Sequence, residues 1–163
     1  DYEKAITLKP DYAEAYYNLG VTLRELGQID SALKSYEKAL AIKHEYPGAH
    51  NNIGTILLNL GSLDSAVDHF EWAIAFKPDY AEAHNNLGVI ERHQEKFDQA
   101  IKSFEKAIDI QADYLQAHSN LGDTLQDIGQ LDAAMTSYEN ALAINPDYSE
   151  ALKGVQRLLK KST

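Results

Sequence analysis

The sequence predicts an all-α protein in which antiparallel helix pairs stack into a solenoid. Two observations lead to this fold class. Several residue types recur every 34 residues along the 163-residue chain, and a repeat of this length is typical of stacked helical units. Inside each unit the apolar residues stand three or four positions apart, as at Leu19, Leu23 and Leu26. This is the spacing of a helix, and no alternating strand pattern competes with it.

The repeat register is defined by residues that hold the same position in every unit. The glycine position consists of Gly20, Gly54, Gly88 and Gly122. An alanine position consists of Ala32, Ala66, Ala100 and Ala134, and an aromatic position of Tyr2, Tyr36, Phe70, Phe104 and Tyr138. Small alanines allow neighbouring helices to approach closely, and we expect the aromatic rings to fill the gaps between successive units.

Four complete units are expected, with partial units on either side. The complete units are residues 13–46, 47–80, 81–114 and 115–148. Residues 1–12 align with the second helix of a unit whose first helix is missing. Residues 149–163 align with a first helix and are expected to form a C-terminal capping helix. Such ends are expected of a piece of a longer array.

Acidic residues indicate where the helices begin. An aspartate stands three residues before a glutamate at Asp11, Asp79 and Asp147. This spacing predicts a capping box at the start of a first helix. The aspartate position represented by Asp30 is expected to cap the second helix of each unit, because a carboxylate accepts hydrogen bonds from unpaired backbone N–H groups.

Glycines indicate where the first helices end, at Gly27, Gly61 and Gly129. Glycine accepts the left-handed conformation that such a stop requires. The third unit departs from the pattern, with Glu95 at the turn position and Glu91 at a position that is leucine in the other units. A side chain is unfavourable in the left-handed conformation, so the turn at residues 94–97 is expected to be reshaped or mobile.

The composition excludes several classes of function. A formal charge of −10 repels phosphate groups and anionic surfaces, so neither nucleic acid nor a membrane is an expected partner. The chain has no Cys, which excludes thiolate metal sites and a cysteine nucleophile. No phosphate-binding loop or catalytic motif is present. We therefore expect no enzyme activity, no cofactor and no metal. The compartment stays open, with the cytoplasm favoured.

Histidines also share a position of the repeat, at His50, His84 and His118. Stacked units are displaced by about 8 to 10 Å, whereas the ligands of one zinc ion all lie about 2 Å from it. These three rings therefore cannot share a metal, and we expect them to pack between helices. No ligand spacing is visible for His44, His69 and His93.

The combined pattern resembles the tetratricopeptide repeat (TPR) family. The resemblance rests on Asn-Leu-Gly in the first helix and on alanine, an aromatic residue, alanine and proline in the second, and it covers essentially the whole chain. It implies a right-handed superhelix that binds protein partners on a concave surface formed by the first helices. The segment 83–88, Ala-His-Asn-Asn-Leu-Gly, also resembles the arrays attached to protein O-linked N-acetylglucosamine transferases.

The strongest candidate for ligand binding is an asparagine position, here called the Asn column, formed by Asn18, Asn52, Asn86 and Asn120. Asparagine is a poor helix former and would rarely be retained on a purely solvated face. The resemblance places this column on the concave surface. A carboxamide both donates and accepts hydrogen bonds, so the column could bind the backbone of an extended peptide. Alternatively, the asparagines tighten the packing between units.

Further candidates surround the Asn column: Tyr17, Asn51, Asn85, Arg24, Leu58, Arg92 and Asp123. This surface mixes apolar, aromatic and charged groups, and favours a neutral or basic internal peptide segment over a free carboxylate terminus. Arg24 and Arg92 are the expected charged anchors, unless they are ordinary solvated helix charges. The only tryptophan, Trp72, is expected on the outer face.

The predicted function is a protein interaction scaffold that binds an extended segment of a partner protein. Two alternatives stay open at this point. The array could be the substrate-selecting arm of a larger glycosyltransferase-like enzyme. It could also assemble with itself, as a dimer or end to end, through apolar residues at the array end such as Tyr2, Ile6 and Leu8.

Overall fold

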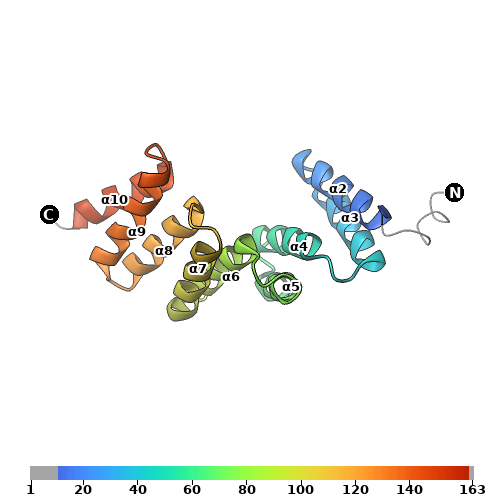
Figure 1. Ribbon diagram of the computed structural model, residues 1–163, viewed down its shortest axis with the longest axis horizontal. Coiled ribbons are helices and arrows are strands. Elements are labelled where there is room, and N and C mark those ends of the chain that lie inside the picture. The colour runs from blue at the N-terminus through green and yellow to red at the C-terminus, as the bar shows by residue number, and fades with distance from the viewer. Residues whose placement is uncertain (1–10, 162–163) are drawn as a thin grey trace. The chain divides into compact units, whose positions relative to one another are not determined.

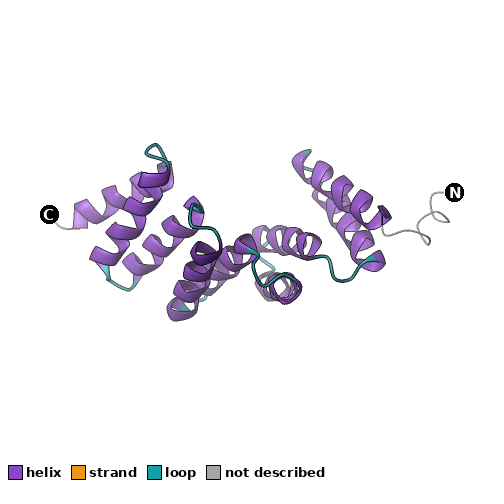
Figure 2. Ribbon diagram, in the orientation of Figure 1, coloured by secondary structure: helices purple, strands orange, loops and turns teal. Residues whose placement is uncertain are grey.

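The computed structural model describes residues 11–161. Within this range every regular element is an α-helix, and there is no strand (Figure 2). This confirms the predicted all-α fold. Of the helix expected over residues 1–12, residues 1–10 lie outside the described range, and Asp11 and Tyr12 begin the first described helix instead. The apolar side chains that suggested self-assembly, Tyr2, Ile6 and Leu8, lie among residues 1–10, and residues 162 and 163 are also outside the described range. None of the described helices combines the length and the apolar character that a bilayer crossing requires.

The chain divides into two compact units, with the boundary between Pro78 and Asp79 (Figure 1). The first unit contains four described helices: α2 (Asp11–Glu25), α3 (Ile29–Ile42), α4 (Pro47–Asn59) and α5 (Leu63–Phe76). The second unit contains five: α6 (Ala81–His93), α7 (Phe97–Ile110), α8 (Leu115–Asp127), α9 (Leu131–Ile144) and α10 (Ser149–Lys161). Consecutive helices pack in pairs, α2 with α3, α4 with α5, α6 with α7 and α8 with α9.

The aromatic position forms the centre of each helix pair. Tyr36, Phe70, Phe104 and Tyr138 are each 0% exposed. Every one of these rings lies against the repeat glycine of its own unit, at Gly20, Gly54, Gly88 and Gly122. A Cβ atom built on these glycines would lie 2.6, 2.7, 2.8 and 2.7 Å from the Cε1 atom of the facing ring. The glycine position therefore exists because a first helix must approach a buried ring closely.

Two of these rings also contact the following first helix. Beside Tyr138, a Cβ atom on Gly154 of α10 would lie 2.4 Å from its Cε1 atom. In the first unit, Tyr36 belongs to a buried cluster with Ile53 and Ile56 of α4. Tyr36 and Tyr138 thus lie between two successive first helices, as expected, and explain how one helix pair packs on the next.

The turns between paired helices follow the glycine prediction. Gly27, Gly61 and Gly129 have φ angles of +74°, +78° and +78°, and Glu95 has a φ angle of +59°. The turn at Glu95 was expected to be reshaped, and this is wrong. Its backbone bonds from Glu95 N to Arg92 O (2.9 Å) and from Lys96 N to Glu91 O (2.8 Å) reproduce those of the glycine turns. The fold therefore imposes the left-handed conformation on a glutamate.

Replacing Glu95 by glycine is expected to raise the free energy of unfolding by about 1 kcal/mol, because a side chain in the left-handed region is strained and glycine is not. Chemical denaturation followed by circular dichroism measures the change. The matched control is Gly129→Glu at the same turn of the next helix pair, which should lower the stability by a similar amount. If both substitutions had effects of the same sign, the turn conformation would not be the cause.

The predicted aspartate caps are wrong for the second helices and for α6. The second helices follow Gln28, Ser62, Lys96 and Gln130, and none of these residues forms a side-chain cap. The aspartate position lies in the first turn instead, as at Asp30. Helix α6 follows Tyr80, also without a side-chain cap. Asp30 and Glu82 lie in the first turn of their helices, where a negative charge interacts favourably with the positive end of the helix dipole.

Candidate functional site

The Asn column and its neighbours divide into buried and accessible residues. Asn51 and Asn85 are 0% and 5% exposed, and Asn52 is 6% exposed. No ligand reaches these side chains while the helices are packed. The column members that reach the surface are Asn18, Asn86 and Asn120. Among the flanking candidates, Tyr17, Arg24 and Leu58 are half-buried.

In the first unit the Asn column takes part in packing between helices. Arg24 Nη1 donates to Asn52 Oδ1 over 3.1 Å, and Asn52 Nδ2 donates to the hydroxyl of Tyr36 over 3.3 Å. The Tyr17 ring lies 5.8 Å from the Tyr36 ring and 4.9 Å from the Tyr46 ring, measured between centroids. Arg24 and Asn52 thus join α2, α3 and α4.

In the second unit polar side chains connect successive first helices. Asn120 Nδ2 on α8 donates to Asn85 Oδ1 on α6 over 2.9 Å. Arg92 Nε donates to Asp127 Oδ2 over 2.7 Å, and Arg92 Nη1 lies 3.4 Å from Asp123 Oδ2. The predicted anchor Arg92 is therefore held by two carboxylates of the next first helix.

Asp123 is the centre of this polar network. Its carboxylate accepts a hydrogen bond from the hydroxyl of Tyr138 over 2.6 Å. It also forms an ion pair with Arg157 of α10. Burial, the hydrogen bond to Asp123 and the charge of that carboxylate raise the pKa of Tyr138 well above its usual value. A single side chain of α8 thus joins three further helices, α6, α9 and α10.

These charged groups line a pocket of about 310 Å³. Its lining consists of Arg92, Asp123, Gln126, Asp127 and Arg157. All five residues lie on first helices, and the two arginines balance the two aspartates. Such a pocket offers both donors and acceptors to a ligand, but no nucleophile paired with a base.

Arg157 was not among the candidates from the sequence. A signal for it exists, because Arg157 stands one repeat of 34 residues after Asp123. Residues at that interval occupy the same position on successive first helices, so opposite charges there can meet. Arg157 lies in the segment assigned to the capping helix, where its charge has an ordinary explanation at a helix end.

The histidine position packs between helices, as predicted for His50 and His118. These rings are 3% and 7% exposed. Their Nε2 atoms lie 3.0 Å from His44 O and 2.9 Å from Ala112 O. Burial lowers the pKa of His50 below its usual value. No sequence pattern linked His50 to His69, yet the structure places His69 Nδ1 only 3.1 Å from His50 Nδ1.

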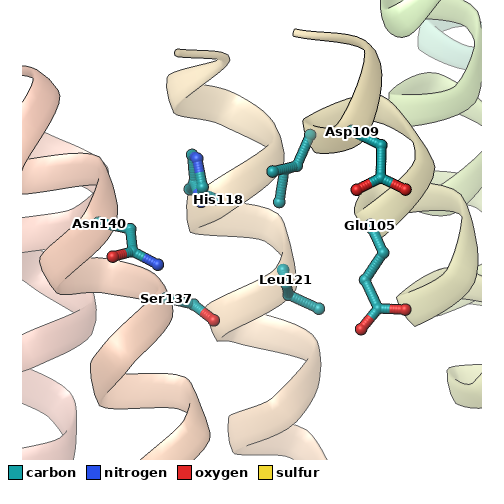
Figure 3. Close-up of a pocket in the computed structure, with 7 residues that line it drawn as sticks. Glu105, Asp109, His118, Leu121, Ser137 and Asn140 are labelled. Carbon is teal, nitrogen blue, oxygen red and sulfur yellow. The ribbon is translucent and has the colours of Figure 1, made fainter. Parts of the chain in front are cut away.

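A second cavity, also of about 310 Å³, lies among α7, α8 and α9 (Figure 3). Its lining consists of Glu105, Ile108, Asp109, His118, Leu121, Ser137 and Asn140. Figure 3 shows His118 and Leu121 on the middle helix, with Asn140 and Ser137 on one side and Asp109 and Glu105 on the other. No sequence pattern indicated this cavity, because it depends on how the side chains of three helices pack together.

Comparisons with known proteins identify the repeat. The family model described as a tetratricopeptide repeat matches residues 11–79, 45–113 and 79–147. No curated protein matches the sequence. Among solved structures, MamA is 25% identical with a TM-score of 0.76, and the match covers 91% of this chain and 87% of that chain.

Two further solved structures are similar in fold. The pilF protein of Pseudomonas aeruginosa is 21% identical with a TM-score of 0.85, over 93% of this chain and 69% of that chain. YrrB, described as a TPR protein with an unusual peptide-binding site, is 21% identical with a TM-score of 0.77, over 99% of this chain and 83% of that chain. At this level of identity the likeness concerns the fold.

Proposed function

Because the chain belongs to the tetratricopeptide repeat family, we propose that it is a protein interaction scaffold that binds an extended peptide segment of a partner on its first helices. The observation that carries the proposal is the polar pocket on α6, α8 and α10. Five polar side chains from first helices converge there without any catalytic pair. The peptide-binding description of YrrB, a protein of similar fold, points in the same direction.

The accessible asparagines are the proposed contacts with the peptide backbone. Asn86 and Asn120 are half-buried on α6 and α8, the helices that also carry Arg92 and Asp123. A carboxamide pairs with both the N–H and the C=O of a peptide. The buried Asn85 acts indirectly, since it accepts the hydrogen bond that positions Asn120. In the first unit, considered by itself, the proposed contacts with a peptide are Asn18, Tyr17 and Leu58, while the buried Asn51 and Asn52 support the packing.

The charge of the pocket indicates which kind of peptide segment the pocket can bind. Two arginines and two aspartates leave no net charge in the lining. A neutral segment can enter without separating an ion pair. A basic residue would have to replace Arg92 at Asp127, whose side chain is 40% exposed, and this exchange costs little because exposed ion pairs contribute little. We therefore propose a neutral or basic internal segment as the ligand.

The test is binding of an internal-peptide library to the native chain and to the double variant Asn86→Ala, Asn120→Ala. Peptides selected on the native chain should bind the double variant at least tenfold more weakly, a loss of about 1.4 kcal/mol or more. Circular dichroism and sizing confirm that both proteins are folded.

Asn140→Ala is the matched control for this experiment. Asn140 is an exposed asparagine on a second helix, α9, so its removal should change peptide affinity less than twofold. Equal affinity of the double variant and the control would show that the Asn column serves packing alone. Failure of the native chain to select any peptide would overturn the proposal itself.

The other predicted functions gain no specific support. The family model identifies the repeat and not the kind of parent protein, so the glycosyltransferase-like arm stays a prediction. Self-assembly also stays a prediction, because the residues that suggested it precede residue 11.

A further inference from the structure

Aromatic and imidazole rings gather on one side of the first unit, at α4, α5 and the loop that precedes α4. His44 lies in that loop, His50 on α4, and His69, Trp72 and Phe76 on α5. The centroid of the His50 ring lies 5.6 Å from His44, 5.2 Å from His69 and 6.3 Å from Trp72. This cluster plays no part in the proposed peptide site.

The hydrogen bonds determine which nitrogen of His50 carries the proton. Its Nε2 atom lies 3.0 Å from the carbonyl oxygen of His44, and a carbonyl oxygen can only accept. The proton of the neutral ring is therefore on Nε2, and the lone pair is on Nδ1. That lone pair faces His69 Nδ1 at 3.1 Å, so the His69 ring donates its Nδ1 proton in the metal-free protein.

We propose that His50 and His69 bind one divalent transition-metal ion through their Nδ1 atoms. The ion belongs to the class that prefers imidazole, with Cu²⁺ the strongest binder and Zn²⁺ and Ni²⁺ also accepted. With metal–nitrogen bonds of about 2.0 to 2.1 Å, two nitrogens 3.1 Å apart subtend an angle of roughly 100° at the metal. This angle lies between those of square-planar and tetrahedral sites, so the separation of the two nitrogens suits a single ion.

The proton balance of binding is simple. The metal takes the place of the proton that lies between the two Nδ1 atoms, and the His69 ring binds this same proton at Nε2 instead. Both rings stay neutral and no net proton is released. His50 already has the arrangement typical of a metal-binding histidine, in which the distal N–H donates to a backbone carbonyl and orients the ring.

The described part of the chain supplies two ligands at this place. Among the described residues, no three His, Cys, Asp or Glu side chains are grouped as a metal site. The other coordination positions therefore belong to water or to a group of a bound partner. The open positions leave the ion able to accept a further ligand.

The second unit contains a natural control for this site. His118 stands two repeats after His50 and makes the equivalent Nε2 contact, to Ala112 O at 2.9 Å. At the positions equivalent to His69 and Trp72 it has Ser137 and Asn140, and these smaller residues border the cavity of Figure 3. The second unit thus presents one correctly oriented imidazole without its partner.

The first experiment titrates the full chain with Cu²⁺ and with Ni²⁺ and follows the fluorescence of Trp72, the only tryptophan. Its ring lies 5.4 Å from His44 and 6.3 Å from His50, so a bound paramagnetic ion should quench it. We expect saturable quenching with one ion per chain, and calorimetry checks the stoichiometry. Absence of saturable quenching by either ion would overturn the proposal.

Two variants make the test specific. His69→Ser introduces the residue found at this position in the other units, Ser35, Ser103 and Ser137, so the fold should be retained. It should weaken binding at least tenfold, whereas His118→Asn should change it less than twofold. Equal affinity of the native chain and His69→Ser would place any bound metal elsewhere.

A gain-of-function variant and a spectroscopic assignment complete the test. Ser137→His places a second imidazole beside His118, and the adjacent cavity has room for it, so the stoichiometry should rise from one ion to two. With Zn²⁺, long-range proton–nitrogen NMR spectra should show metal on Nδ1 and a proton on Nε2 for both His50 and His69. Coordination through Nε2 of either ring would contradict the proposed site. No peptide is needed, so these results are independent of the scaffold proposal.

Discussion

Replacing Gly88 by alanine is expected to lower the free energy of unfolding by about 2 kcal/mol, although alanine normally stabilises a helix relative to glycine. The added Cβ atom would lie 2.8 Å from Cε1 and 3.0 Å from Cδ1 of Phe104. Real Cβ atoms do not approach a carbon so closely. Phe104 is 0% exposed, so its ring cannot move into solvent. The helices α6 and α7 must separate instead.

Chemical denaturation of Gly88→Ala, followed by circular dichroism, measures this loss. The double variant with Phe104→Leu is the decisive control, because the smaller side chain makes room for the methyl group. We expect the alanine to cost at least 1 kcal/mol less in the Phe104→Leu background than beside the native phenylalanine, a coupling in the range found between contacting residues, about 0.5–3 kcal/mol. Undiminished stability of Gly88→Ala would show that the glycine has another purpose.

The fold class could be predicted from the sequence because it depends on local regularities. The 34-residue interval and the helical spacing of apolar residues do not depend on the details of side-chain packing. The left-handed turns at the three glycines were predicted for the same reason, because glycine readily adopts the left-handed conformation whatever packs around it. The role of Gly88 was not predicted, because it depends on Phe104, 16 residues later, and on how closely two helices approach.

The candidate site was predicted less completely, because helix rotation decides which side chains are accessible. Successive residues of a helix are about 100° apart around its axis. Asn85 is therefore buried while the adjacent Asn86 is half-buried. Sequence periodicity does not determine the rotation to this accuracy. The His50–His69 contact also depends on side-chain conformations across neighbouring helices, which no repeat pattern specifies. The 34-residue interval relates Asp123 to Arg157, but whether the two side chains meet depends on their conformations too.

Replacing Asp123 by alanine is expected to lower the free energy of unfolding by about 2 kcal/mol, because it removes the shared acceptor of a partly buried network. The carboxylate is 23% exposed and pairs with Arg92 and Arg157. It also accepts the Tyr138 hydroxyl. Asp127→Ala is the matched control. Asp127 lies on α8 like Asp123 and pairs with Arg92 of α6, but its side chain is 40% exposed. Its replacement by alanine should therefore lower the free energy of unfolding by less than about 1 kcal/mol.

The pH dependence of Asp123→Ala separates the network from a general loss of charge. Burial, the Asp123 hydrogen bond and its charge raise the pKa of Tyr138 above the usual value of 10.0. A raised pKa means that the folded state holds its proton more tightly, so the stability that Tyr138 contributes is lost as the pH rises above 10.0. Asp123→Ala should lower the Tyr138 pKa and weaken this alkaline loss, which tyrosinate absorbance and denaturation can follow. Asp127→Ala should leave both unchanged. If the two variants behaved alike, Asp123 would be a surface charge like any other and not the centre of the polar network on α6, α8 and α10.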